Sequence, residues 1–85
     1  MFKLFTGHNR GFHMTFENGW TVSVQWGPIN YCHNYGIDKP EDESLTAETA
    51  CWLNGGAVSE VVGHRTADDV AAYILGVSLR KPAEL

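Results

Sequence analysis

The residues with the most reactive side chains are an adjacent pair, Cys32 and His33, and a second cysteine, Cys51. A thiolate can act as a nucleophile or as a zinc ligand, and an imidazole can serve it as a base or bind the same metal. The other histidines are His8, His13 and His64. These residue types could support either of two chemistries, cysteine catalysis or zinc binding.

The spacing and the charge of the surrounding residues disfavour both chemistries. Structural zinc sites usually present closely spaced ligand pairs such as C-x2-C, and this chain has none. Acidic residues follow Cys32, ending in the run Glu41-Asp42-Glu43, and neighbouring negative charge disfavours a thiolate. No signature of a cysteine enzyme surrounds Cys32. We therefore expect two free thiols, no metal, no cofactor and no enzymatic activity.

Composition narrows the partners that the chain could have. It has 85 residues, with six Lys and Arg against ten Asp and Glu, a net charge of −4, and no basic cluster. This charge disfavours direct binding to nucleic acid.

No apolar run is long enough for a signal peptide or a membrane span, so we expect a cytoplasmic protein without membrane contact. A single domain over residues 1–85 is near the size at which one core is marginal without a partner, a metal or a disulfide, so a homodimer is one expected way of adding to the core.

Two segments, 12–16 and 20–26, alternate apolar and polar residues and predict a β-hairpin. A two-residue Asn18-Gly19 turn would place their apolar sets on opposite faces. A three-residue loop over 17–19, with Gly19 left-handed, instead brings both sets to one face. We predict the longer loop, which places Phe16 opposite Trp20, Met14 opposite Val22 and Phe12 opposite Val24.

Three further strands and one helix complete the predicted fold. Residues 1–5 form a first strand, followed by a turn over 6–11. Residues 45–53 and 57–62 form a second hairpin around 54–56, in which either Ala50 and Trp52 or Cys51 and Leu53 face inward.

The last predicted element is a helix that begins after Thr66, a good N-cap. Asp68 and Asp69 lie in its first turn, where the helix dipole favours negative charge. Its apolar stripe is Val70, Ile74 and Val77, and Arg80 and Lys81 suit its C-terminal end. The fold class is α+β, an antiparallel meander of about five strands with one C-terminal helix packed on the sheet.

A long segment without periodicity, residues 27–44, separates the two hairpins. Loops of this length in small domains often carry function. Its aromatic residues suit a protein interface, and its acidic run could imitate nucleic-acid phosphates on a basic target. The candidate partner-binding residues are Tyr31, Cys32, His33, Tyr35, Glu41, Asp42 and Glu43.

The stretch Phe16-Glu-Asn-Gly-Trp-Thr-Val-Ser-Val-Gln-Trp-Gly-Pro-Ile-Asn-Tyr-Cys32 resembles a group of small proteins encoded by tailed bacteriophages and prophages. Their pattern is F-x-N-G-x-T-x-S-x-Q-x-G-x-x-N-Y-C, then an acidic loop, an A-E-x-A-x-W strand and a T-x-D-x-V helix. The later parts match residues 47–52 and 66–70 here. The resemblance implies a phage setting and contains no catalytic motif.

In that setting, the first expectation is a non-enzymatic anti-defence protein in the host cytoplasm. It would inhibit a bacterial immunity component, such as a CRISPR effector, through the 27–44 loop and an exposed sheet face. One alternative is a sponge that binds a small nucleotide immune signal. The other is an accessory structural phage protein.

Overall fold

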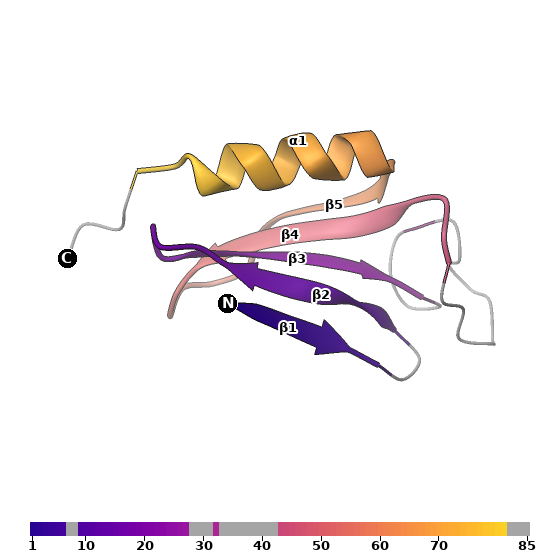
Figure 1. The fold of residues 1–85 in the computed structure, drawn as a ribbon, viewed down its shortest axis with the longest axis horizontal. Coiled ribbons are helices and arrows are strands. Elements are labelled where there is room, and N and C mark those ends of the chain that lie inside the picture. The colour runs from indigo at the N-terminus through magenta and orange to yellow at the C-terminus, as the bar shows by residue number, and fades with distance from the viewer. Residues whose placement is uncertain (7–8, 28–31, 33–42, 82–85) are drawn as a thin grey trace.

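The computed structural model describes residues 1–6, 9–27, 32 and 43–81. Within these residues, one five-stranded antiparallel sheet has its strands in chain order, and one helix lies against it (Figure 1). The elements are β1 (Phe2–Phe5), β2 (Arg10–Thr15), β3 (Trp20–Trp26), β4 (Ala47–Leu53), β5 (Ser59–Arg65) and α1 (Ala67–Ser78). The predicted α+β meander with a C-terminal helix is confirmed. No helix among the described residues is long and apolar enough to cross a membrane.

The β2–β3 hairpin has the predicted register and the predicted three-residue loop. Phe12 lies opposite Val24 and Met14 opposite Val22. The loop is closed by hydrogen bonds from the Phe16 amide to the Trp20 carbonyl, 2.9 Å, and from the Gly19 amide to the Phe16 carbonyl, 3.0 Å. Gly19 has φ 89°, the left-handed conformation that such a loop needs and that glycine adopts without strain.

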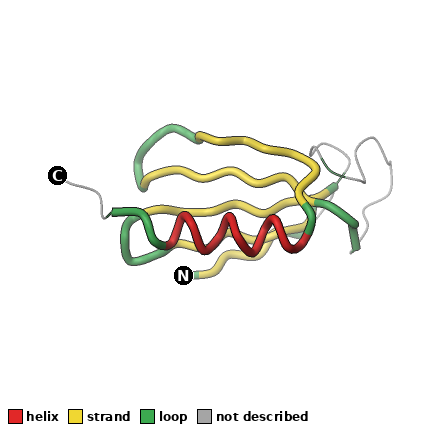
Figure 2. Tube along the Cα trace, turned by 90° about the horizontal axis from the view of Figure 1, so that it is seen from above, coloured by secondary structure: helices red, strands yellow, loops and turns green. Residues whose placement is uncertain are grey.

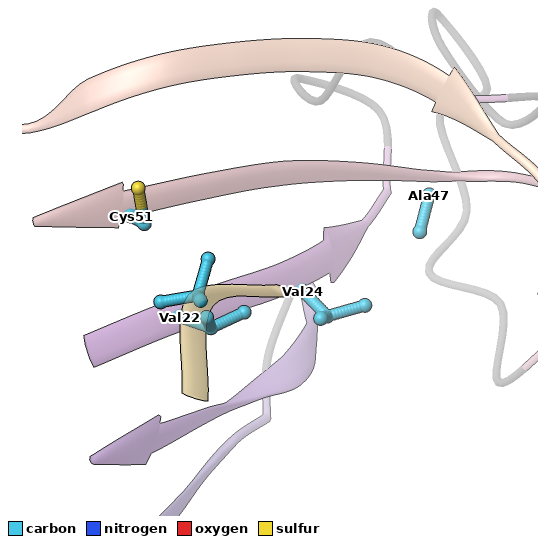
Figure 3. Packing of buried hydrophobic residues seen from close by; sticks show 5 residues of the cluster. Val22, Val24, Ala47 and Cys51 are labelled. Atoms are coloured by element: carbon cyan, nitrogen blue, oxygen red, sulfur yellow. The ribbon is translucent and has the colours of Figure 1, made fainter. Parts of the chain in front are cut away.

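The core lies between the sheet and α1. Its buried part is a layer of small side chains: Val22, Val24, Ala47, Cys51 and Val77. Figure 3 shows four of them, Val22 and Val24 on β3 and Ala47 and Cys51 on β4. Larger, partly buried side chains surround this layer: Phe12, Phe16, Trp20, Trp26, Val70, Tyr73 and Ile74. Trp20 and Trp26 therefore pack against the core. The choice left open for β4 is also settled, because Cys51 pairs with Val22 on the helix side of the sheet.

Helix α1 begins where the sequence predicts. The Thr66 hydroxyl accepts a hydrogen bond from the Asp69 amide, 3.2 Å, and the Asp69 carboxylate accepts one from the Thr66 amide, 3.1 Å. This reciprocal capping box satisfies two otherwise free amides at the helix start. Within the described ranges α1 contacts β3, β4 and β5, and neither β1 nor β2 (Figures 1 and 2).

Several predicted boundaries were wrong. Arg10 and Gly11, placed in a turn, belong to β2, because Gly11 pairs with Phe5 across the ladder. Strand β4 begins at Ala47 rather than at residue 45. Arg80 does not extend the last helical turn: α1 ends at Ser78, and Arg80 instead forms an ion pair with Glu60 at 2.7 Å.

Strand β5 runs from Ser59 to Arg65, instead of over 57–62 as predicted, and it is irregular. Its pairing with β4 shifts register twice. Glu60 and His64, which lie at these shifts, both have φ 54°, a left-handed conformation that is uncommon for residues other than glycine. Each shift adds one residue to β5 relative to β4, as in a β-bulge. The outer edge of the sheet at β5 is therefore uneven.

Candidate functional site

The sheet face away from α1, here called the open face, carries the most distinctive surface chemistry. No helix or strand among the described residues packs over it. Its centre is polar: the hydroxyls of Thr15 and Thr21 hydrogen-bond at 2.9 Å, and the Gln25 amide donates to the Ser23 hydroxyl at 2.8 Å. Alternate residues of β3 point to opposite faces of the sheet. Thr21, Ser23 and Gln25 therefore lie on the open face, and the core residues Val22 and Val24 lie on the face toward α1.

Three rings form a row across the open face. The Phe5 and His13 rings meet edge to face with their centroids 4.4 Å apart, and the His13 and Trp52 rings do so at 4.9 Å. These residues come from β1, β2 and β4, so the Trp52 ring extends past β3. It can do so because the intervening β3 residues, Thr21 and Ser23, have small side chains and are buried beneath the row. We call Phe5, His13 and Trp52 the aromatic row.

Sequence reasoning did not find the aromatic row. The alternation in 12–16 did place His13 on the face opposite Phe12 and Met14, which is where it lies. The face of Trp52 was left open, and the ring contacts depend on the β1–β2 and β3–β4 registers together. The one available signal was the alternation that set His13 apart from the apolar face of its strand.

The environment of His13 disfavours its charged form. Burial lowers the pKa of His13 below its usual value of 6.5, and the positive charge of Lys3 lowers it further. The Nε2 atom is buried, and no hydrogen-bond partner meets it. A proton added there would lack an acceptor, so the neutral imidazole is the form that suits the aromatic row.

We expect the protein to lose stability as the pH falls below about 6.5, because of His13. The unfolded chain then binds a proton at this residue while the folded protein resists it, so protonation favours unfolding. The loss begins near the unfolded pKa and is complete below the lowered folded pKa. His13→Gln should weaken the pH dependence of the melting temperature between pH 7.5 and pH 5. His64→Gln is the matched substitution at an exposed histidine, and equal effects of the two substitutions would contradict this assignment.

A group of polar and charged side chains surrounds Cys51, under the C-terminal end of α1. Its Sγ lies 3.6 Å from Arg80 Nη1, 3.7 Å from Glu60 Oε2 and 3.8 Å from Ser59 Oγ. One Arg80 nitrogen, Nη2, donates to both Glu60 oxygens, at 2.7 and 2.8 Å. Cys51 is fully buried, so no substrate reaches its sulfur. The cluster joins β4, β5 and the end of α1 rather than presenting a nucleophile.

A pocket of about 470 Å³ opens at the other end of α1. Its walls are mostly apolar, with Arg65 and Glu43 as charged members; the lining residues are Phe12, Val24, Trp26, Glu43, Ser44, Leu45, Thr46, Ala47, Arg65, Ala67 and Val70. The Arg65 guanidinium stacks 4.6 Å from the centre of the Tyr73 ring. Pockets of this size and character can hold a small molecule.

The residues proposed from sequence have different outcomes. Cys32 is buried, and its sulfur accepts a hydrogen bond from the Gly27 amide at 3.4 Å, so it supports the end of β3. Glu43 is exposed at the rim of the pocket. The other proposed residues lie outside the described part of the chain: Tyr31, His33, Tyr35, Glu41 and Asp42.

Both cysteines are free thiols, as expected, and both are buried. Over the described ranges, no three His, Cys, Asp or Glu side chains come together in a way that could hold a metal ion. The open face and the pocket are therefore the two candidate sites that the described residues provide.

No protein-family model, no curated protein and no solved structure matches this chain.

Proposed function

We propose that this protein is a non-enzymatic binding protein that recognises a partner protein through the open face. The observation that carries the proposal is the aromatic row, which crosses a sheet face that no described element covers. Aromatic rings held by strands offer large contact areas at little entropic cost, and they often anchor protein interfaces. The half-buried Thr15 and Gln25 side chains lie on the same face and can add hydrogen bonds to the partner.

The positions of the two thiols support binding over catalysis. Cys32 and Cys51 are the nucleophile candidates from the sequence, and both are enclosed by protein. A nucleophile has to reach its substrate, and the bonds of Cys32 to Gly27 and the packing of Cys51 against Val22 serve the fold instead.

For the class of partner, we propose a component of bacterial immunity in the cytoplasm of a phage-infected cell. The support is the resemblance to small phage proteins and the acidic charge, a net −4 with the acidic run 41–43. Negative charge favours association with basic surfaces, which proteins that bind nucleic acid must present. The acidic run would add long-range attraction to the contacts of the open face.

The pocket favours a second candidate, the binding of a small molecule such as a nucleotide signal. Its apolar walls include Phe12 and Trp26, which could hold a flat ring. Among the lining residues that the structure describes, Arg65 is the cation, so the pocket suits a ligand of low charge better than one with several phosphates.

The proposal is tested by capture from bacterial lysate with three versions of the tagged protein. Trp52→Thr removes one ring of the aromatic row, and Leu75→Thr changes an exposed residue on the outer side of α1 as a matched control. We expect one bacterial protein to be retained by the wild type and by Leu75→Thr, and at least about tenfold less by Trp52→Thr. Thermal denaturation of both variants checks that they are folded.

The immunity proposal requires that the retained protein belong to a defence system and that its activity fall when the purified binding protein is added. Equal retention by all three versions would contradict recognition through the open face. A small molecule released from the heated wild-type protein, with no partner retained, would replace the first candidate with the second.

A further inference from the structure

The two edge strands of the sheet, β5 and β1, differ in how regularly they pair with their neighbours. Strand β5 has two register shifts and the left-handed residues Glu60 and His64, features that hinder the addition of another strand. Strand β1 pairs with β2 in continuous register, and it contains no proline and no glycine. No strand in the described part of the chain pairs with its outer edge, which can therefore accept another strand.

The side chains of β1 are unusually exposed for their type. Phe2 is 77% and Leu4 75% exposed, and both point to the helix side of the sheet, where α1 does not reach β1. An exposed, regular and apolar edge is a surface on which strands associate.

The ladder shows which backbone groups of β1 are free. Met1 and Thr15 exchange two hydrogen bonds, at 2.8 and 2.9 Å, so the terminal amino group and the carbonyl of Met1 point toward β2. In an antiparallel ladder this direction alternates from residue to residue. The backbone groups of Lys3 and Phe5 thus also face β2, while those of Phe2, Leu4 and, beyond the strand, Thr6 face outward.

We propose that two copies of this chain pair through β1 in antiparallel orientation, with the two-fold axis at Leu4. Each Leu4 then faces Leu4 of the second copy, and each Phe2 faces Thr6 of the second copy. All of these residues have outward backbone groups, so each pair exchanges two hydrogen bonds. The Phe2 and Leu4 side chains of both copies gather on the half of the sheet that α1 leaves bare.

The charge on the opposite face selects this register. With the axis at Leu4, Lys3 lies opposite Phe5 of the second copy, a favourable cation–aromatic pair. Within one chain the Lys3 ammonium already lies 5.7 Å from the centre of the Phe5 ring. An axis at Lys3 would place two lysines directly opposite each other, which is destabilising, and would leave Thr6 without a partner. With the axis at Leu4, the β1 edges of two copies therefore match in their hydrogen-bonding groups, their apolar side chains and their Lys3–Phe5 pairs.

The pairing joins the open faces of the two copies. Phe5 belongs to the aromatic row, so Lys3 of the second copy lies beside that row and completes its β1 end. Because the contact consists of one short strand from each copy, its area lies near the lower limit for specific interfaces, and we expect a dissociation constant in the micromolar range. The dimer does not depend on the proposed function.

Sedimentation velocity of the full chain at concentrations from about 1 to 500 μM tests the proposal, since this range brackets a micromolar dissociation constant. We expect the wild type to change from monomer to dimer across it. Leu4→Lys places two like charges at the axis and should remain monomeric. Leu79→Lys is the control, because Leu79 is 74% exposed and follows α1, and it should dimerise like the wild type.

Cross-linking tests the register. Paired residues that exchange hydrogen bonds have Cα atoms about 5.5 Å apart, within the range that a disulfide spans. Leu4→Cys should therefore form a covalent dimer under mild oxidation, and Lys3→Cys should not. A wild type that is monomeric throughout, or a Leu79→Lys variant that loses the dimer equally, would overturn the proposal. Cross-linking through Lys3→Cys in preference to Leu4→Cys would overturn the axis at Leu4.

Discussion

Gly11→Ala will lower the free energy of unfolding by at least about 3 kcal/mol or prevent folding, a loss at the severe end of single substitutions. A Cβ atom at this position would lie 2.1 Å from the Val24 carbonyl oxygen and 2.8 Å from the Gln25 Cα. Both are backbone atoms of β3, so relief requires separating β2 from β3. The φ of Gly11, +150°, is also one that residues with a side chain rarely adopt.

Gly76→Ala is the matched control for Gly11→Ala. Gly76 lies inside α1, and a Cβ atom there would meet nothing within 4 Å. Alanine is favoured over glycine in a helix interior by up to about 1 kcal/mol, so this variant should be more stable than the wild type. Urea unfolding followed by circular dichroism measures both changes. Similar midpoints for the two variants would show that the close approach at Gly11 is wrong.

Asn18→Asp is expected to destabilise the protein by about 2–4 kcal/mol at pH 7, because several buried partners lose their donor together. The Asn18 Nδ2 donates to the carbonyl oxygens of Val77, 2.9 Å, Ser78, 3.3 Å, and Arg80, 3.1 Å. Its Oδ1 accepts from the Trp20 amide at 3.0 Å. Aspartate keeps the acceptor for Trp20 and replaces the donor with a negative charge that faces the carbonyl end of α1.

The comparison of Asn18→Asp with Asn18→Ala separates two contributions. Alanine removes the donor and the acceptor without adding charge, so it should cost less than aspartate if repulsion from the helix end matters. Asn54→Asp, in the exposed turn of the β4–β5 hairpin, is the control and should change stability by less than about 0.5 kcal/mol. Denaturant midpoints for the three variants decide the case. A tolerated Asn18→Asp would mean that the turn does not cap α1.

Asn18 also shows the limit of the sequence-based prediction. Its place in a three-residue hairpin loop followed from the alternation of Phe12, Met14 and Phe16 with their polar neighbours, and the structure confirms it. Its bonds to the end of α1 join residues about sixty positions apart in the chain. No local pattern encodes such a contact, because it exists only after the helix has packed across the sheet.

The candidate site was less predictable than the fold. The sequence drew attention to the 27–44 loop, since its aromatic and acidic residues are conspicuous. Of the proposed residues described by the structure, Cys32 is buried against Gly27 and Glu43 is exposed beside the pocket. The aromatic row was missed because its members are far apart in the chain, and neither Phe5 nor His13 stands out alone.

By itself, the sequence determined the local elements: the hairpin register from period-two alternation, the helix start from Thr66 and the acidic first turn, and the α+β class from their order. These depend on interactions between near neighbours, which a pattern records. Only the tertiary structure decided which face of β4 is inward, where β5 shifts register, and which rings meet on the open face. Those outcomes depend on how α1 and the strands pack together around one core. Each strand alone is compatible with more than one register or inward face.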